Sequence, residues 1–107
     1  IYKDNISQIL SFGEVSFDTV RNELWDHQNL IYLTSSESKI MQIFSKSIGV
    51  PITRFDLIKA LRTDGKPMND RAIDVQITRL RRKIERKPKE PRYLQTLRGI
   101  GYMLTAD

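Results

Sequence analysis

The stretch Asp70-Arg71-Ala72-Ile73-Asp74-Val75-Gln76-Ile77-Thr78-Arg79-Leu80-Arg81-Arg82-Lys83 decides the fold, because its apolar residues recur with the period of an amphipathic helix. At about 100° per residue, four of them fall within one narrow arc and predict the buried side of the helix. These are Ile73, Ile77, Leu80 and Ile84. We expect the helix to begin at Asn69 or Asp70 and to end before Pro88, which cannot continue it.

The opposite side of this predicted helix mixes arginines, a hydroxyl, a carboxylate and one apolar residue. Its members are Arg71, Val75, Thr78 and Arg82, with Asp74 and Arg79 beside them and Arg81 and Lys83 on the flanks. Arginine can pair with guanine, a methyl group can contact thymine, and a carboxylate can accept from cytosine. A solubilising face would more often pair Glu with Lys. The pattern favours a helix that reads duplex DNA, although a merely solvated basic surface remains an alternative.

The charge of the chain is concentrated in its second half. Residues 1–53 carry four basic and six acidic residues, a net charge of −2, whereas residues 54–107 carry a net charge of +7. A basic half beside a slightly acidic half indicates a surface for a polyanion rather than a generally basic protein. The 107 residues suit one small domain, and no apolar run is long enough to span a membrane.

The segments around the basic helix predict a small sheet, two further helices and a closing hairpin. Strand-like pieces come first, at Leu10–Phe12, Val15–Phe17, Thr19–Leu24 and Leu30–Leu33. Thr34 and Glu37 have the spacing of a capping box, before a helix that continues through Ile48 and stops at Gly49.

After Gly49, a short extended piece, Pro51-Ile52, precedes a brief helix capped by Thr53 that ends near Leu61. Residues 62–69 form a turn-rich loop, and residues 93–97 and 100–104 form two strands joined around Arg98-Gly99. Helix, turn, helix, helix and hairpin together outline an α+β winged helix-turn-helix. An arginine at a hairpin tip can enter a narrow minor groove, which gives Arg98 a candidate role.

Catalytic and metal-binding patterns are missing from the sequence. Cysteine is absent, and the single histidine, His27, lies in a turn-like stretch without clustered acids. We find no zinc-protease, phosphate-loop, dinucleotide-binding or serine-hydrolase motif. We therefore expect no enzyme activity, no metal and no cofactor.

Three pieces of the sequence resemble the OmpR/PhoB family of bacterial response-regulator effector domains. They are Leu33-Thr34 with Glu37, Asp70–Ile77 with Leu80-Arg81, and Thr96–Tyr102. Their order and spacing extend the resemblance over about residues 10–104. It implies a four-stranded N-terminal antiparallel sheet, three helices and a C-terminal β-hairpin wing in residues 10–107, with residues 1–9 as the remnant of an interdomain linker.

The resemblance also implies roles for individual residues. Base edges would be contacted by Val75, Thr78 and Arg79. The DNA backbone would be contacted by Arg71, Gln76, Arg81, Arg82, Lys83 and Thr96, and the minor groove by Arg98. A loop that meets RNA polymerase in some members corresponds to Arg62, Thr63, Asp64, Gly65 and Lys66. Leu61-Arg62 stands where the family often has Trp-Gly, a departure next to that loop.

Finally, the resemblance implies partners for an intact bacterial protein. These are a receiver domain in the same chain, a sensor kinase that phosphorylates it, and double-stranded DNA with tandem half-sites. Two copies would bind that DNA as a homodimer in the cytoplasm, at the nucleoid, while the isolated domain would be monomeric and independent of membranes. The alternative from another class is a winged-helix protein-interaction module whose basic face meets an acidic partner.

Overall fold

The computed structural model describes residues 8–62 and 68–107. Over these residues the elements are β1 (Ile9–Phe12), β2 (Val15–Asp18), β3 (Glu23–Asp26), β4 (Asn29–Ile31), α1 (Ser35–Ser45), β5 (Ile52–Thr53), α2 (Arg54–Leu61), α3 (Asp70–Ile84), β6 (Leu94–Leu97) and β7 (Gly101–Leu104). The α+β winged helix-turn-helix is therefore confirmed. Most of the predicted linker, residues 1–9, lies outside the described residues.

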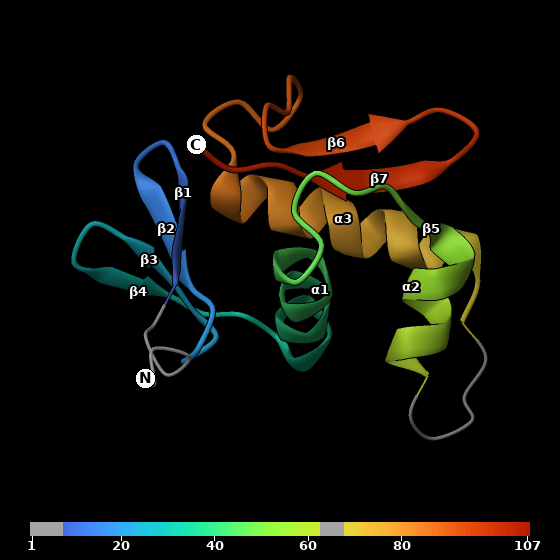
Figure 1. Cartoon of the computed structure of the whole chain (residues 1–107), viewed down its shortest axis with the longest axis horizontal. Helices are drawn as coiled ribbons and strands as arrows, with labels where there is room; N and C mark the ends of the chain where they lie inside the picture. Colours follow the sequence, from blue (N-terminus) through green and yellow to red (C-terminus); the bar gives the residue numbers. More distant parts are fainter. Residues whose placement is uncertain (1–7, 63–67) are drawn as a thin grey trace, which may run out of the picture.

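α3 is the central element of the molecule (Figure 1). The β6–β7 hairpin runs along one side of it and α1 packs against another, while α2 lies near its N-terminal end and the β1–β4 sheet near its C-terminal end. The four predicted stripe residues of α3 are buried, with exposures of 0% for Ile73, Ile77 and Leu80 and 1% for Ile84. The sequence period thus correctly predicts which face of α3 enters the core.

The N-terminal sheet is antiparallel, with strand order β1-β2-β3-β4, and contributes one apolar face to the core. Phe12, Phe17 and Leu24 are its buried residues. The alternation of apolar and polar residues in β2 leads to this burial, because successive side chains of a strand point to opposite faces.

The predicted strand Thr19–Leu24 is wrong in its first four residues, which form the turn between β2 and β3. The Asp18 carboxylate accepts hydrogen bonds from the backbone N–H groups of Val20 and Arg21, at 2.9 and 3.0 Å. Asn22 then adopts a left-handed conformation with φ of 59°. Asp and Asn are suited to such turns because their short side chains bond locally to the backbone.

The helices begin where the capping residues predict. In α1, Thr34 and Glu37 form the complete capping box, and Thr53 and Asn69 cap α2 and α3. The expectation that α1 continues through Ile48 is wrong, because the helix ends at Ser45. Gly49, with φ of 78°, instead lies in the following turn and donates its N–H to the carbonyl of Leu104 at 2.9 Å.

The closing hairpin belongs to a three-stranded sheet with the order β5-β7-β6, which the sequence reading did not include. β5 pairs antiparallel with β7, placing Ile52 opposite Tyr102 and Thr53 opposite Gly101. A Cβ atom on Gly101 would lie 2.1 Å from the carbonyl oxygen of Ile52, so only glycine fits this close approach. This third strand ties the start of α2 to the end of β7 that adjoins the wing turn.

Candidate nucleic-acid interface

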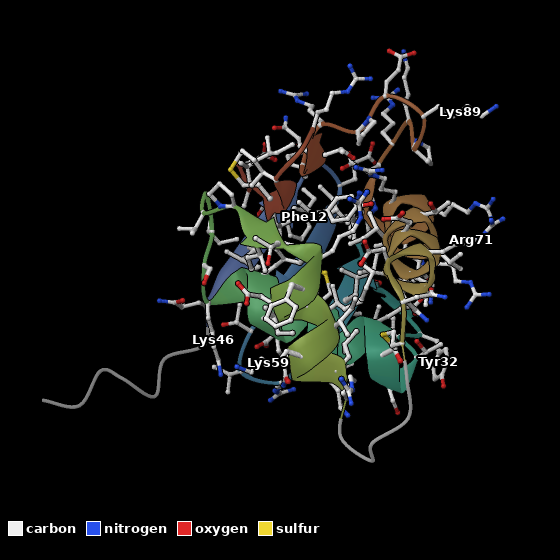
Figure 2. The ribbon with its side chains drawn as sticks, turned by 90° about the vertical axis from the view of Figure 1, so that its right-hand side faces the viewer. Phe12, Tyr32, Lys46, Lys59, Arg71 and Lys89 are labelled. Atoms are coloured by element: carbon white, nitrogen blue, oxygen red, sulfur yellow. The ribbon has the colours of Figure 1, made fainter. Side chains whose placement is uncertain are left out.

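The outward face of α3 is formed by exposed side chains from successive turns. They are Arg71, Val75, Thr78, Arg79 and Arg82. The side chain of Arg71 projects away from the body of the molecule (Figure 2). Val75 is 41% exposed although it is apolar, and the Thr78 hydroxyl donates to the Asp74 carbonyl at 2.9 Å. This bond fixes the Thr78 side chain along the helix.

The wing presents Arg98 in the turn between β6 and β7, where it is exposed. Gly99 has φ of 78°, and the N–H of Ile100 closes the turn on the carbonyl of Leu97 at 2.9 Å. Ile100 at the same turn is 54% exposed. The wing tip is therefore a compact hairpin turn with one projecting arginine.

The carboxylate of Asp74, which the sequence places beside the outward arginines, is partly exposed but is held by protein partners. Its carboxylate accepts a hydrogen bond from Nε of Arg54 at 2.8 Å and another from the hydroxyl of Tyr102. Burial acts to raise the pKa of Asp74, but the hydrogen bonds from Tyr102 and Arg54 outweigh it and lower the pKa. Asp74 therefore links α3 to α2 and β7.

Arg81 connects α3 to the wing. Its Nε donates to the carbonyl of Leu94 at 2.9 Å, and one terminal nitrogen donates to Oγ1 of Thr96 at 2.7 Å. Its guanidinium lies 5.7 Å from the ring centre of Tyr102, and that of Arg54 lies 5.5 Å from it. Burial lowers the pKa of Arg81, yet an arginine stays charged at any physiological pH.

Lys83 is directed toward the N-terminal half of the chain. Its Nζ lies 2.5 Å from Oε1 of Glu37 and donates to the carbonyl of Tyr32 at 2.7 Å. Glu37 is only 1% exposed. Burial acts to raise its pKa, but hydrogen bonds from Lys83 and Thr34 lower it overall.

The remaining predicted contact residues are spread along α3 and the loop before it. Gln76 is half-buried, and its Oε1 accepts no hydrogen bond from the described residues. Arg62 is exposed at the end of α2. Thr63, Asp64, Gly65 and Lys66, the rest of the predicted polymerase loop, lie outside the described residues.

Two residues that support the interface, Arg54 and Tyr102, were not predicted from the sequence to have a role in it. Both bond to Asp74, and both depend on the pairing of β5 with β7. The one sequence signal that bears on them is the Thr53 cap, which puts Arg54 at the first position of α2.

Other kinds of site have little support in the described part of the chain. His27 is exposed in the turn between β3 and β4, with Nδ1 2.9 Å from Oδ1 of Asp26. No cluster of three or more His, Cys, Asp or Glu side chains suited to a metal ion occurs among residues 8–62 and 68–107. Within the same ranges, no helix has the length and apolar character needed to cross a membrane.

Comparison with known sequences gives a family match over most of this chain. The family model "Transcriptional regulatory protein, C terminal" matches residues 27–104. Protein PetR of Rhodobacter capsulatus is 48% identical over 103 residues, which cover 92% of this chain and 44% of PetR. The transcriptional regulatory protein AruR of Pseudomonas aeruginosa is 36% identical, over 89% of this chain and 39% of AruR. The chain thus spans less than half the length of these relatives.

Solved structures give the same family. The response regulator DrrB, a Thermotoga maritima OmpR/PhoB homologue, superposes with a TM-score of 0.77 at 30% identity, covering 91% of this chain and 44% of DrrB. The DNA-binding domain of Klebsiella pneumoniae RstA, solved in complex with the RstA box, gives a TM-score of 0.71 at 28% identity, covering 92% of this chain and 97% of that domain. Together with the fold and the outward basic helix, these matches show that the chain belongs to the C-terminal domain family of transcriptional regulators and is a DNA-binding output domain of the OmpR/PhoB type.

Proposed function

We propose that α3 enters the major groove of duplex DNA and reads its sequence with Val75, Thr78 and Arg79. The observation that carries this proposal is the composition of the exposed α3 face, where an apolar side chain is 41% exposed among arginines. An α-helix fits the major groove, where arginine can bind guanine through two hydrogen bonds and apolar groups can contact the thymine methyl. Arg79 is the strongest candidate for a guanine contact.

Contacts to the DNA backbone fix the position of the helix. Arg71 and Arg82 flank the reading residues and are exposed, so their guanidinium groups can extend to phosphates. Arg81 and Thr96 contact phosphate together. Arg81 can do so because it uses two of its five N–H donors within the protein and retains three. Gln76 and Lys83 complete the proposed set, although Lys83 must exchange its contacts with Glu37 and Tyr32 to reach DNA.

The wing is the second contact point. Arg98 enters the minor groove beside the major groove that α3 occupies, because the negative potential of a narrow minor groove attracts arginine. The turn that carries it is short and closed by a backbone hydrogen bond, so little backbone freedom is lost when Arg98 binds.

In the intact protein we propose that this domain is the output of a phosphorelay. Phosphorylation of a receiver domain by a sensor kinase would bring two copies together on tandem half-sites in the bacterial cytoplasm, at the nucleoid. The segment Arg62–Lys66 is the proposed contact with RNA polymerase. The support for these partners is the family match, together with the portion of PetR and AruR that lies outside the matched region.

Selection of bound sites from a random duplex pool tests the DNA-reading proposal. The selected duplex and a scrambled duplex of equal length are then titrated with the domain at several salt concentrations. We expect the selected duplex to bind about 10³-fold or more tightly than the scrambled one, with log K falling linearly in log salt for both. Equal binding of both duplexes, or no enriched sequence, contradicts sequence-specific reading and favours the acidic protein partner.

A further inference from the structure

A groove of about 520 Å³ lies between α3 and the loop that follows it. One wall is formed by Thr78, Arg81 and Arg82 of α3. The other is formed by the loop residues Lys87, Pro88, Lys89 and Glu90. Since Thr78 and Arg82 also belong to the outward face of α3, the groove is continuous with the proposed interface.

The loop that forms the outer wall is anchored by a buried carboxylate. Glu85, at the end of α3, is 7% exposed, and its carboxylate accepts hydrogen bonds from the backbone N–H groups of Arg92, Tyr93 and Leu94 at 2.8, 2.9 and 2.7 Å. Within the loop, the N–H of Glu90 donates to the carbonyl of Lys87 at 2.8 Å. Pro88 and Pro91 restrict the backbone further. The loop therefore has a defined shape before any ligand binds.

The groove is lined by more positive than negative charge. Arg81, Arg82, Lys87 and Lys89 line it against a single acid, Glu90. Arg82, Lys87 and Lys89 are exposed, whereas Arg81 is held by Leu94 and Thr96. Lys89 extends to the same side of the molecule as Arg71, whereas Lys46 and Lys59 lie toward other sides (Figure 2).

When α3 lies in the major groove of DNA, a sugar–phosphate strand passes beside the protein groove between α3 and the following loop. A helix with its side chains is about 10–12 Å across, and the major groove is about 12 Å wide. A helix in the groove is therefore bordered by a sugar–phosphate strand on each flank. The loop residues Lys87 and Lys89 stand on one flank of the C-terminal half of α3.

We propose that this groove is an additional phosphate-binding site, in which Lys87 and Lys89 hold the DNA strand that borders the major groove beside the C-terminal half of α3. This inference rests on the proposed insertion of α3 into DNA and extends its footprint beyond the residues that the family resemblance assigns. The site recognises phosphate and not base sequence, so it strengthens binding to all duplexes alike.

The test compares two double variants that remove equal charge. Lys87→Ala/Lys89→Ala removes the proposed site, and Lys46→Ala/Lys59→Ala removes two exposed lysines elsewhere. Each variant and the wild-type domain are titrated with the selected duplex and with the scrambled duplex between 0.05 and 0.2 M salt. Thermal unfolding of both variants checks that the fold is intact.

We expect the Lys87→Ala/Lys89→Ala variant to lose about 1.8 from the magnitude of the log K against log salt slope, because each neutralised phosphate contributes about 0.9. The ratio of the wild-type to the variant binding constant would then grow about 12-fold as the salt concentration falls from 0.2 to 0.05 M. Ethylation of two phosphates on the bordering strand should weaken binding of the wild-type domain but no longer weaken binding of this variant. The control variant should keep the wild-type slope and interference pattern.

The outcomes separate this inference from the proposed function. If the wild-type domain prefers the selected duplex but both double variants lose equal slope, the phosphate site is absent and the DNA-reading function stands. If the wild-type domain does not distinguish the two duplexes, the proposed function fails, whatever the lysine variants do. An unchanged interference pattern in Lys87→Ala/Lys89→Ala also overturns the site.

Discussion

The cations around α3 fall into two sets that differ in what they contact. Arg54, Arg81 and Lys83 bond to other parts of the protein. By contrast, Arg79 and Arg82 are exposed on the outward face and form no ion pair with a described residue. We call the first the structural set, although its members Arg81 and Lys83 are also proposed phosphate contacts, and the second the DNA-facing set; charge alone does not separate the two.

The structural set joins segments that are far apart in the chain. Arg54 and Tyr102 meet at Asp74, Arg81 reaches the wing at Thr96, and Lys83 reaches Glu37. Each bond fixes the orientation of α3 relative to a neighbouring element. The outward set can therefore meet DNA from a prearranged frame, which lowers the entropy lost on binding.

The largest expected effect is on stability and comes from Lys83→Met. This change leaves the carboxylate of Glu37, which is 1% exposed, without its cationic partner. Breaking a buried ion pair commonly costs about 3–5 kcal/mol. Because Lys83 retains 26% side-chain exposure and Thr34 still bonds to Glu37, we expect the free energy of unfolding to fall by about 3 kcal/mol. Urea denaturation measures this loss.

The neighbouring substitution Arg82→Met is the matched control for Lys83→Met. Arg82 lies in the same turn of α3 but is exposed, so we expect a change within about 0.5 kcal/mol in the free energy of unfolding. Equal destabilisation by the two variants would contradict the division into a structural and a DNA-facing set.

Periodic and local features of this fold could be predicted from the sequence. The Ile73/Ile77/Leu80/Ile84 stripe and the caps at Thr34, Thr53 and Asn69 depend on residues a few positions apart, and the structure contains all of them. Such signals act within one element, so a single sequence exposes them.

Features that depend on distant segments could not be predicted in the same way. The two-residue strand β5 exists because β7 passes beside it, and Gly101 permits that approach. Asp74 looks like a surface carboxylate until Arg54 and Tyr102 are placed around it. The same reason explains why the sequence does not predict the bond between Lys83 and Glu37.

The second largest effect concerns DNA recognition. Arg79→Ala should weaken binding to the selected duplex by roughly 1–3 kcal/mol and relax the preference at one base pair, because a bidentate arginine–guanine contact is lost. Binding to the scrambled duplex and the free energy of unfolding should change little. Repeating the site selection with the variant measures the loss of preference.

Arg21→Ala provides the control for charge, since Arg21 is exposed in the turn between β2 and β3 on the N-terminal sheet. It should leave both affinity and base preference close to wild type. If Arg79→Ala weakens the selected and scrambled duplexes equally, Arg79 contacts phosphate and not a base.

A smaller effect is expected from Asp74→Asn, which tests the structural set at its centre. The amide keeps the size of the side chain but removes the charge that holds Arg54 and weakens the bond from Tyr102. Since the side chain is 42% exposed, solvent reduces the contribution, and we expect a loss of about 1–2 kcal/mol in the free energy of unfolding.

A double-mutant cycle with Tyr102→Phe checks this mechanism. If Asp74 and Tyr102 act through their hydrogen bond, the two changes should be less than additive by about 0.5 kcal/mol or more. Full additivity would show that Asp74 stabilises the domain through other contacts.

The dependence of stability on pH gives a further measure of the ion pair between Glu37 and Lys83. The pKa of Glu37 is lowered from 4.5 in the folded protein, so its contribution is present above pH 4.5 and is lost as the pH falls through the folded pKa. We expect Glu37→Gln to flatten the acid decline of the free energy of unfolding, by at most about 1.4 kcal/mol per pH unit. Urea denaturation from pH 6 to 2.5 measures the decline in the free energy of unfolding. Identical declines in wild type and variant would contradict this assignment.

The smallest expected effect comes from Val75→Ala, which asks whether the outward face is covered by DNA. Val75 is 41% exposed in the unbound domain, so removing its two outer methyl groups should change the free energy of unfolding little. If a thymine methyl packs on those groups, the variant should lose about 0.5–1 kcal/mol of binding to the selected duplex and none to the scrambled one. Val20→Ala, which alters an apolar residue 59% exposed on the β2–β3 turn, should leave binding to both duplexes unchanged. A Val75→Ala variant that loses stability but keeps its selectivity would place Val75 with the structural residues of α3, and the outward face would then read DNA through its arginines alone.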